Sequence, residues 1–248
     1  AVFPGEPVDE TEYIRAVCEV TNAECNPVTP TAEEFWRDLS TLVKCQEEPF
    51  ISTSVYAQWR VMKRAKERGI TVLLDGQGGD ELLCGYVPYY LYYLLTLKKH
   101  RKYTRLLVEG IRSYYLTKPF IKTHLKRLLI GILAYWKSLM IKWWTDLSNQ
   151  VLLEDAPSEM ILRSKTPFDD LGAILEIDTS TTSLPALLRY EDKNSMWHSI
   201  EARVSFLDRP FFEYVASLPL NRKLQSGWTK HVFRLAMKSI LPDKIRFR

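Results

Sequence analysis

The stretch Val72-Leu73-Leu74-Asp75-Gly76-Gln77-Gly78-Gly79-Asp80-Glu81-Leu82-Leu83 decides the fold of this 248-residue chain. An apolar, strand-like run leads directly into three glycines within four positions, followed by two carboxylates and a helix-like run. Open α/β sheets bind ligands at the carboxyl ends of their strands, and glycine lets backbone N–H groups approach a phosphate closely at a helix start. Adjacent carboxylates can hold the metal that accompanies a nucleotide. The stretch therefore predicts a nucleotide site at a strand-loop-helix junction.

Other well-known glycine-rich or acidic motifs do not fit this loop. It lacks the Lys and Ser/Thr of a P-loop and the GxGxxG pattern of a dinucleotide fold. It fails as an EF-hand because Gly79 stands where an oxygen ligand belongs and Tyr86 where the bidentate Glu belongs. Taken alone, the loop also fits a tight turn that binds nothing.

The residues before the loop predict two helices and a strand. Thr31-Ala32-Glu33-Glu34 has the capping-box pattern that starts a helix. A second helix follows Ser52–Ser54 and is expected to end at Gly69. Residues 70–74 carry no charge, which is typical of a strand covered on both faces. The second helix has an apolar stripe at helical spacing, made of Val55, Trp59, Met62 and Ala65. This alternation predicts a parallel α/β unit.

The remainder of the chain is predicted to be mainly helical. We expect three parts: residues 1–86 as a nucleotide-binding α/β part, 87–183 as a helical, basic portion, and 184–248 as a helical return. Residues 167–183 are acidic and turn-prone, as in a linker. The fold class is therefore α/β, with a partial parallel sheet and a large helical remainder. Further expectations are helix breaks at Pro119 and Pro157, irregular structure at 203–208, and a last helix from Thr229 to Pro242 with Phe233, Ala236 and Ile240 on one face.

Composition indicates a globular protein that works in a reducing compartment. Hydrophobic residues make up 46% and charged residues 26%, and no signal peptide is visible. We expect a cytoplasmic location. The cysteines form no CxxC pair and have no histidine at zinc spacing, so they are predicted to be reduced core thiols, with a metal cluster as the less favoured alternative. The four are Cys18, Cys25, Cys45 and Cys84.

The charge is unevenly distributed along the chain. From Lys98 to Lys142 there are twelve Lys and Arg and a single acid, Glu109, a net charge of +11. Because the whole chain carries +4, the rest carries −7. A solvated helical face is the favoured interpretation of the basic segment. An amphipathic helix in weak contact with an anionic membrane surface is the alternative.

A second constellation, Tyr190 to Asp208, alternates charges and hydroxyls more densely than an amphipathic helix requires. Such polar groups are either solvated or locked in a buried network, and the pattern alone favours the solvated state. His198 by itself is better explained as a hydrogen-bonded structural histidine than as a catalyst.

The two constellations, in this order, resemble the synthetase domain of glutamine-dependent asparagine synthetases. That family carries a strand followed by S-G-E-G-x-D-E and a Gly-Tyr pair, matched here by residues 75–81 and Gly85-Tyr86. It then carries S-M-x-x-S-x-E-x-R-x-P-F-L-D, matched by residues 195–208 with Ser205 in place of proline. A late T-K-x-x-x-R is matched by Thr229-Lys230 and Arg234, and Val2-Phe3-Pro4-Gly5 resembles the second strand of the family's nucleotide domain.

The resemblance implies an ATP-pyrophosphatase fold and a carbon–nitrogen ligase that uses ATP and Mg²⁺. A small carboxylate such as aspartate becomes an acyl-adenylate, and ammonia derived from glutamine displaces AMP. A catalytically inactive binding or scaffold module is the alternative, and no nucleic-acid partner is implied.

The resemblance also assigns roles to residues of this chain. Asp80 would be a magnesium ligand and Lys230 would face the phosphates. Val2 and the backbone of Asp75 and Gly76 would border the nucleotide. Glu201 and Arg203 would brace the site.

Three departures from the family pattern affect the interpretation of this chain as a synthetase domain. The family's pyrophosphate loop, S-G-G-x-D-S, and its N-terminal glutaminase domain do not occur here, so we expect a fragment of a longer protein or a chain whose missing parts come from elsewhere. The family's loop reads Ser-Gly-Glu where this chain reads Asp75-Gly76-Gln77. A neutral amide cannot accept the proton of attacking ammonia. Either Gln77 only orients the substrate, or the carboxylate has moved two positions back to Asp75, on the same side of an extended segment.

Overall fold

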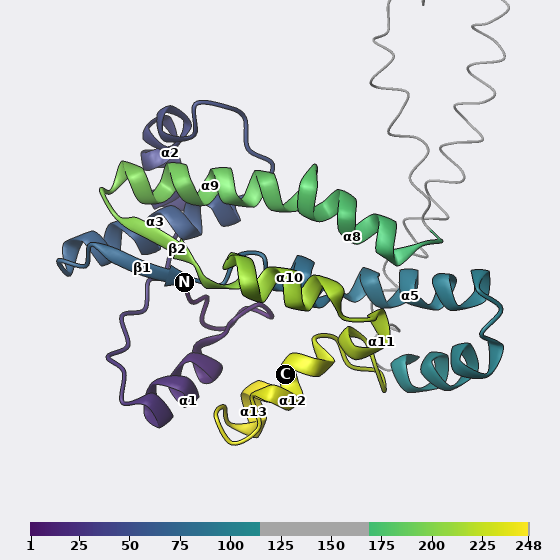
Figure 1. Ribbon diagram of the computed structural model, residues 1–248. Helices are drawn as coiled ribbons and strands as arrows, with labels where there is room; N and C mark the ends of the chain where they lie inside the picture. Colours follow the sequence, from purple (N-terminus) through teal and green to yellow (C-terminus); the bar gives the residue numbers. More distant parts are fainter. Residues whose placement is uncertain (115–168, 248) are drawn as a thin grey trace, which may run out of the picture. The chain divides into compact units, whose positions relative to one another are not determined.

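The computed structural model of the chain describes residues 1–114 and 169–247 (Figure 1). The described residues form two compact units, each assembled from segments that are distant in sequence. Unit 1 contains residues 1–83, 176–223 and 230–248, and unit 2 contains residues 84–175 and 224–229. The three-part division at 86/87 and 183/184 stays a prediction.

Unit 1 is mainly helical and contains a small parallel sheet, as the α/β prediction requires. The sheet pairs β1 (Val72–Asp75) with β2 (Glu201–Val204), and Asp75 stands opposite Val204 in the register. The helices that precede the sheet residues or lie between them are α1 (Thr11–Thr21), α2 (Ala32–Gln46), α3 (Ser54–Glu67), α4 (Gly79–Leu83) and α9 (Ser183–Trp197). After β2 come the 3₁₀ turn η2 (Ser205–Leu207) and α10 (Arg209–Ser217), α11 (Leu220–Lys223), α12 (His231–Ala236) and α13 (Asp243–Arg246).

The first helices form for the reasons that the sequence indicated. The Thr31 side chain accepts a hydrogen bond from the Glu34 N–H at 3.2 Å, and the Glu34 carboxylate accepts one from the Thr31 N–H at 3.1 Å. This capping box starts α2, as predicted. Gly69 follows α3 with φ +74°, the left-handed conformation that ends a helix with little strain in glycine. The predicted stripe of α3 is buried at all four positions, Val55, Trp59, Met62 and Ala65.

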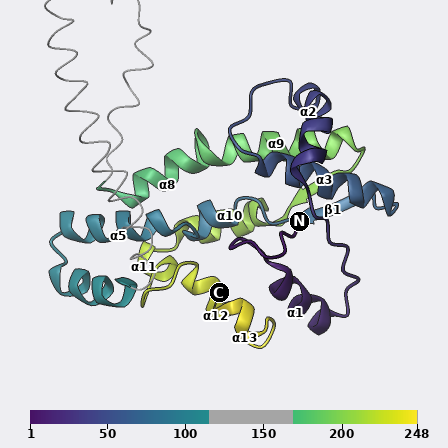
Figure 2. The same cartoon turned by 180° about the vertical axis from the view of Figure 1, so that it is seen from behind.

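Helix α9 completes the core of unit 1. It packs against α2, α3 and β2 (Figures 1 and 2). Tyr190 of α9 joins a buried cluster with Leu42 and Cys45 of α2 and with Val55 and Trp59 of α3. Helical structure from Leu184 onward is thus confirmed, and α9 lies on the helices that precede the glycine loop.

Two expectations about the sheet are wrong. Residues 201–204 form a strand, whereas irregular structure was expected from Arg203. Within the described residues β1 pairs only with β2, and Leu74 is 76% exposed, so the strand is not covered on both faces. The physical reason is strand alternation, which turns Leu73 toward Met62, Ala65 and Ile200 and turns Leu74 to the opposite face.

The segment expected to be a linker is largely helical. Helix α8 (Leu171–Ser180) occupies most of residues 167–183. Asp170 accepts hydrogen bonds from the N–H groups of Gly172 and Ala173 at 3.0 and 3.4 Å, and the Leu171 side chain is fully buried. Asp170, one of the acidic residues that suggested a linker, therefore caps the start of α8.

Three further expectations need correction. Residues 2–5 do not form a strand: Val2 and Phe3 have no regular structure, and a turn closed by the Glu6 N–H donating to Phe3 O at 3.0 Å contains Pro4 and Gly5, with Gly5 at φ +86°. The helix predicted from Thr229 to Pro242 is the shorter α12, which ends at Ala236; Ile240 beyond it is 62% exposed, and a further short helix, α13, follows. Cys18 and Cys25 form a disulfide across seven residues, because the turn after α1 returns the chain to the helix. Cys45 and Cys84 are free and buried, as predicted for all four.

Unit 2 contains α5 (Val87–Lys99) and further helical residues at 103–114. The Tyr90 hydroxyl donates a hydrogen bond to the buried Glu109 carboxylate and accepts one from the Gly227 N–H at 2.8 Å. Pro119, Pro157 and most of the basic segment lie outside the described residues. Of the helices that are described, none combines the length and the apolar character needed to span a membrane.

Candidate functional site

The two sequence constellations meet at the glycine loop. A Cβ atom at Gly78 would lie 2.5 Å from Leu207 Cδ2, and one at Gly79 would lie 3.3 Å from the Phe206 ring. Gly78 also has φ +83°, a conformation that L-residues rarely adopt. The loop is therefore glycine-rich because it packs tightly on the Phe-Leu-Asp end of the second constellation.

Helix α4 fixes the position of the two loop carboxylates. It is a single five-residue turn, so its dipole adds less positive potential than the sequence suggested. Leu82 and Leu83 anchor it in a buried cluster with Val215 of α10. The Glu81 carboxylate is 1% exposed and accepts a hydrogen bond from Ser183 Oγ at 2.8 Å. Asp80 therefore stands on a well-anchored element.

Asp80 and Lys230, predicted as a metal ligand and a phosphate contact, form an ion pair with each other. Lys230 Nζ lies 2.8 Å from Asp80 Oδ1, and both side chains are partly exposed. Lys230 adopts φ +50°, in the left-handed region, immediately before α12. The structure thus brings together two residues that are 150 positions apart, which is the arrangement expected of a shared phosphate and metal site.

These residues fit Mg²⁺ that is coordinated jointly by the protein, the nucleotide phosphates and water, and not Mg²⁺ that is coordinated by protein side chains alone. Among the residues that the structure describes, no three His, Cys, Asp or Glu side chains gather closely enough to hold a metal. Mg²⁺ in nucleotide sites commonly takes one or two carboxylates together with phosphate oxygens and water. Asp80 can supply one such carboxylate, with Lys230 moving from Asp80 to the phosphates.

Asp75, at the end of β1, has a second carboxyl group beside it. Glu191 on α9 is 2% exposed, and within the described part of the chain neither of its carboxyl oxygens has a conventional hydrogen-bond donor. Burial and then the neighbouring Asp75 raise the pKa of Glu191 to about 8. The two carboxyl groups can hydrogen-bond only when one is protonated, and the raised pKa of Glu191 keeps that group protonated at neutral pH.

Gln77 and Gly76 lie in the loop between Asp75 and Gly78. The strand ends at Asp75, and Gln77 lies in the turn that follows. The extended geometry that would place Asp75 and Gln77 on one side is therefore absent. A second carboxyl group at the site comes from Glu191 instead.

The second constellation is partly buried, so the solvated interpretation is wrong for its core. Asn194 is fully buried, donates hydrogen bonds to Val55 O at 3.1 Å and Gln58 Oε1 at 2.9 Å, and accepts one from the buried Gln46 at 2.8 Å. Glu201 and Arg203, predicted to brace the site, are exposed and paired with each other at 2.8 Å. His198 packs its ring 4.8 Å from that of Trp59, and burial lowers its pKa.

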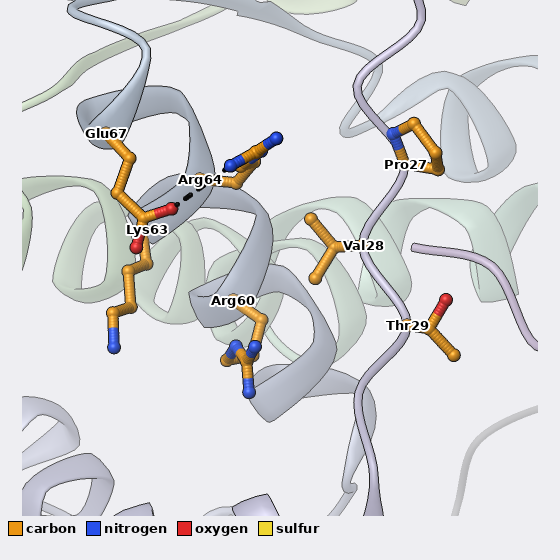
Figure 3. A pocket seen from close by; sticks show the side chains of 7 residues that line it. All are labelled: Pro27, Val28, Thr29, Arg60, Lys63, Arg64 and Glu67. Carbon is orange, nitrogen blue, oxygen red and sulfur yellow. Dashed lines mark hydrogen bonds and ion pairs between the residues drawn. The ribbon is translucent and has the colours of Figure 1, made fainter.

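Val2, predicted to border the nucleotide, is buried, and its hydrogen-bond partner lines a pocket. Its N–H donates a hydrogen bond to Val28 O at 2.8 Å, and Val28 lines a pocket of about 210 Å³ between residues 27–29 and α3 (Figure 3). None of the predicted site residues lines this pocket. Two of its three cations are already paired, since Arg60 lies 2.7 Å from Glu34 and Arg64 lies 3.5 Å from Glu67, and the third, Lys63, lies over the Trp59 ring. The pocket therefore does not replace the glycine loop as the candidate site.

Sequence reasoning missed Glu191. It stands in a run of charged residues, and no local pattern marks which of them is buried. Its position on α9, one residue after the buried Tyr190, is the one available signal.

The family model for asparagine synthase matches residues 1–248. The chain is 26% identical to asparagine synthetase (glutamine-hydrolyzing) 1 of Bacillus subtilis (strain 168), over 98% of this chain and 40% of that protein. It is also 26% identical to a putative asparagine synthetase (glutamine-hydrolyzing) of Mycobacterium bovis, over 99% of this chain and 39% of that protein. The chain thus spans about 40% of the length of these relatives. The chain belongs to the asparagine synthase family.

Proposed function

We propose that the chain is the synthetase part of an ATP-dependent amidotransferase, which activates a carboxylate such as aspartate and transfers ammonia to it. The observation that carries the proposal is the ion pair between Asp80 and Lys230 beside the glycine loop that follows Asp75, although Lys230 is far from the loop in sequence. Membership of the asparagine synthase family supports the reaction class. The ATP-pyrophosphatase fold and a cytoplasmic location belong to the same proposal.

The proposed first step is adenylation. An oxygen of the substrate carboxylate attacks the α-phosphorus of ATP, the bond to the β-phosphate breaks, and pyrophosphate leaves. Asp80 would hold Mg²⁺, which neutralises phosphate charge. Lys230 would contact the phosphates, and Val2 with the backbone of Asp75 and Gly76 would border the nucleotide.

The proposed second step is amide formation. Ammonia attacks the acyl carbon, a C–N bond forms, and the C–O bond to AMP breaks with its electron pair going to the phosphate oxygen. The proton that nitrogen loses goes to a carboxylate. Gln77 cannot accept it; the proposal gives that role to Asp75, at the end of β1 beside Glu191, and leaves Gln77 to orient the substrate. The ammonia would come from glutamine through a glutaminase domain outside this chain.

The test is aspartate-dependent exchange of labelled pyrophosphate into ATP. The chain lacks the S-G-G-x-D-S loop, so the assay uses the full-length protein product that carries this sequence. Exchange that requires both Mg²⁺ and the carboxylate supports the proposal. ATP binding without exchange, over a panel of small carboxylates, would instead identify an inactive binding module.

A further inference from the structure

The buried carboxyl group of Glu191 has no conventional hydrogen-bond donor, which is unusual enough to require an explanation. Buried charged groups are almost always paired with a cation or hydrogen-bonded, because removal from water is costly. Glu191 is 2% exposed, and in the described part of the chain its neighbour is another carboxyl group, that of Asp75. A site of this kind is stable only while one of the two groups is protonated.

No cation on the packed elements compensates Glu191. On α9 itself, Arg189 lies 2.8 Å from Glu48, and Lys193 pairs with Glu47. The other charged or titratable groups of α2, α3 and β2 with assigned contacts pair among themselves: Arg37 with Asp38, Asp38 with Tyr56, Arg60 with Glu34, Arg64 with Glu67, and Glu201 with Arg203. Lys63 lies over the Trp59 ring, and Cys45 contacts the Lys193 carbonyl. Asp75 is thus the one charged group that acts on Glu191 within the described residues.

We propose that Glu191 is a positioning residue: in its protonated form it donates a hydrogen bond to the Asp75 carboxylate and holds it as the acceptor of the proton that attacking ammonia loses. The inference rests on the proposed function and deepens it. The chemistry is balanced, because Glu191 keeps its own proton throughout. Asp75 takes the ammonia proton while the C–N bond forms and AMP leaves.

Three variants separate this role from simple space filling. Glu191→Gln mimics the neutral acid and can still donate a hydrogen bond, whereas Glu191→Leu fills the space without a donor. Glu109→Gln is the control, because it removes another buried carboxylate, in unit 2, far from the loop in sequence. All three are compared for pyrophosphate exchange and for amide formation between pH 6 and 9.

The expected results differ between the two reactions. Glu191→Leu should lower amide formation by about tenfold or more while exchange stays within about threefold. Glu191→Gln should retain amide formation at pH 7 and lose the decline that the wild-type protein shows as pH rises through about 8. Amide formation by Glu191→Leu at the wild-type rate, or an unchanged alkaline decline in Glu191→Gln, would overturn the proposal.

An NMR titration, which needs no catalytic activity, tests the role of Glu191 separately from the proposed function. With ¹³C-labelled carboxyl groups, the Asp75 resonance should shift as Glu191 titrates, and this shift should vanish in Glu191→Gln. Absence of exchange in the wild-type protein would refute the amidotransferase, and the titration would still report whether the pair shares a proton. Independent titration of Asp75, with exchange intact, would refute only the role of Glu191.

Discussion

At the residue scale, the site depends on carboxyl groups whose surroundings differ. Asp80 is partly exposed and paired with a lysine, Glu81 is buried and accepts a hydroxyl hydrogen bond, and Asp75 stands beside the buried Glu191. Environments that separate the protonation states of neighbouring acids are typical of catalytic sites. We therefore expect the four carboxyl groups to have distinct roles.

Glu191 should make the stability of the protein depend on pH. Its pKa is about 8 in the folded state and 4.5 in a solvated chain, so the folded state binds the proton more tightly. The contribution of Glu191 to the free energy of unfolding is complete below about pH 4.5 and is lost as pH rises through about 8. We expect the free energy of unfolding to fall by a few kcal/mol, roughly, over this range. Urea unfolding at several pH values measures the fall, and Glu191→Gln should remove it; an equal slope in both proteins would contradict the assignment.

Replacement of Asp75 tests whether its carboxylate is the general base that accepts the proton from ammonia. Asp75→Ser should lower amide formation by about 10²–10⁴-fold in rate, because it removes the carboxylate that is proposed to accept the proton. Adding Gln77→Glu rebuilds the Ser-Gly-Glu order of the family and should restore part of the rate. The rate is measured with the natural carboxylate substrate. A double variant no faster than Asp75→Ser would mean that Asp75 contacts the nucleotide and is not the base.

Asp80 and Lys230 should matter for rate and little for folding. Asp80→Asn and Lys230→Ala each remove one preorganised charge, which typically costs about 10²–10³ in rate. Their ion pair is partly exposed, so its loss should change the free energy of unfolding by about 1 kcal/mol or less. Pyrophosphate exchange and urea unfolding are the paired measurements. Normal exchange in both variants would show that Asp80 and Lys230 form a surface salt bridge with no part in the reaction.

At the scale of elements, the glycine loop and the second constellation act as one packed unit. A methyl group at Gly78 would meet Leu207 at 2.5 Å, whereas one at Gly69, with a similar positive φ, would meet no atom within 4 Å. Gly69→Ala is therefore a matched control for backbone strain alone. We expect Gly78→Ala to cost about 1–3 kcal/mol more than Gly69→Ala, owing to overpacking. Urea unfolding gives both values, and equal losses would show that the loop does not need this close contact.

Sequence patterns predicted the elements whose signals are local. The capping box at Thr31, the stripe of α3 and the glycine after it all follow from neighbouring residues, and the structure contains each of them. The strand at 201–204 and the burial of Glu191 and Asn194 depend on partners more than 100 residues away, β1 and α3. No local pattern reveals such partners. The family motifs singled out Asp80 and Lys230, which the structure pairs, but gave no sign that Glu191 lies beside Asp75; the roles of these residues stay predictions.

At the scale of the whole molecule, the central claim is that the chain belongs to an enzyme that activates a carboxylate through its adenylate. This mechanism moves one carboxylate oxygen onto AMP, because the C–O bond breaks on the acyl side when ammonia attacks. Alternative activation through an acyl phosphate would place that oxygen on inorganic phosphate and would yield ADP.

The most direct test follows the carboxylate oxygen of the substrate into the nucleotide product. The full-length protein product is supplied with ATP, Mg²⁺, ammonia and aspartate labelled with ¹⁸O in the side-chain carboxylate, and the nucleotide products are analysed by mass spectrometry. The account predicts one ¹⁸O atom in AMP for each amide formed. Unlabelled AMP, or ¹⁸O recovered in inorganic phosphate together with ADP, would contradict it.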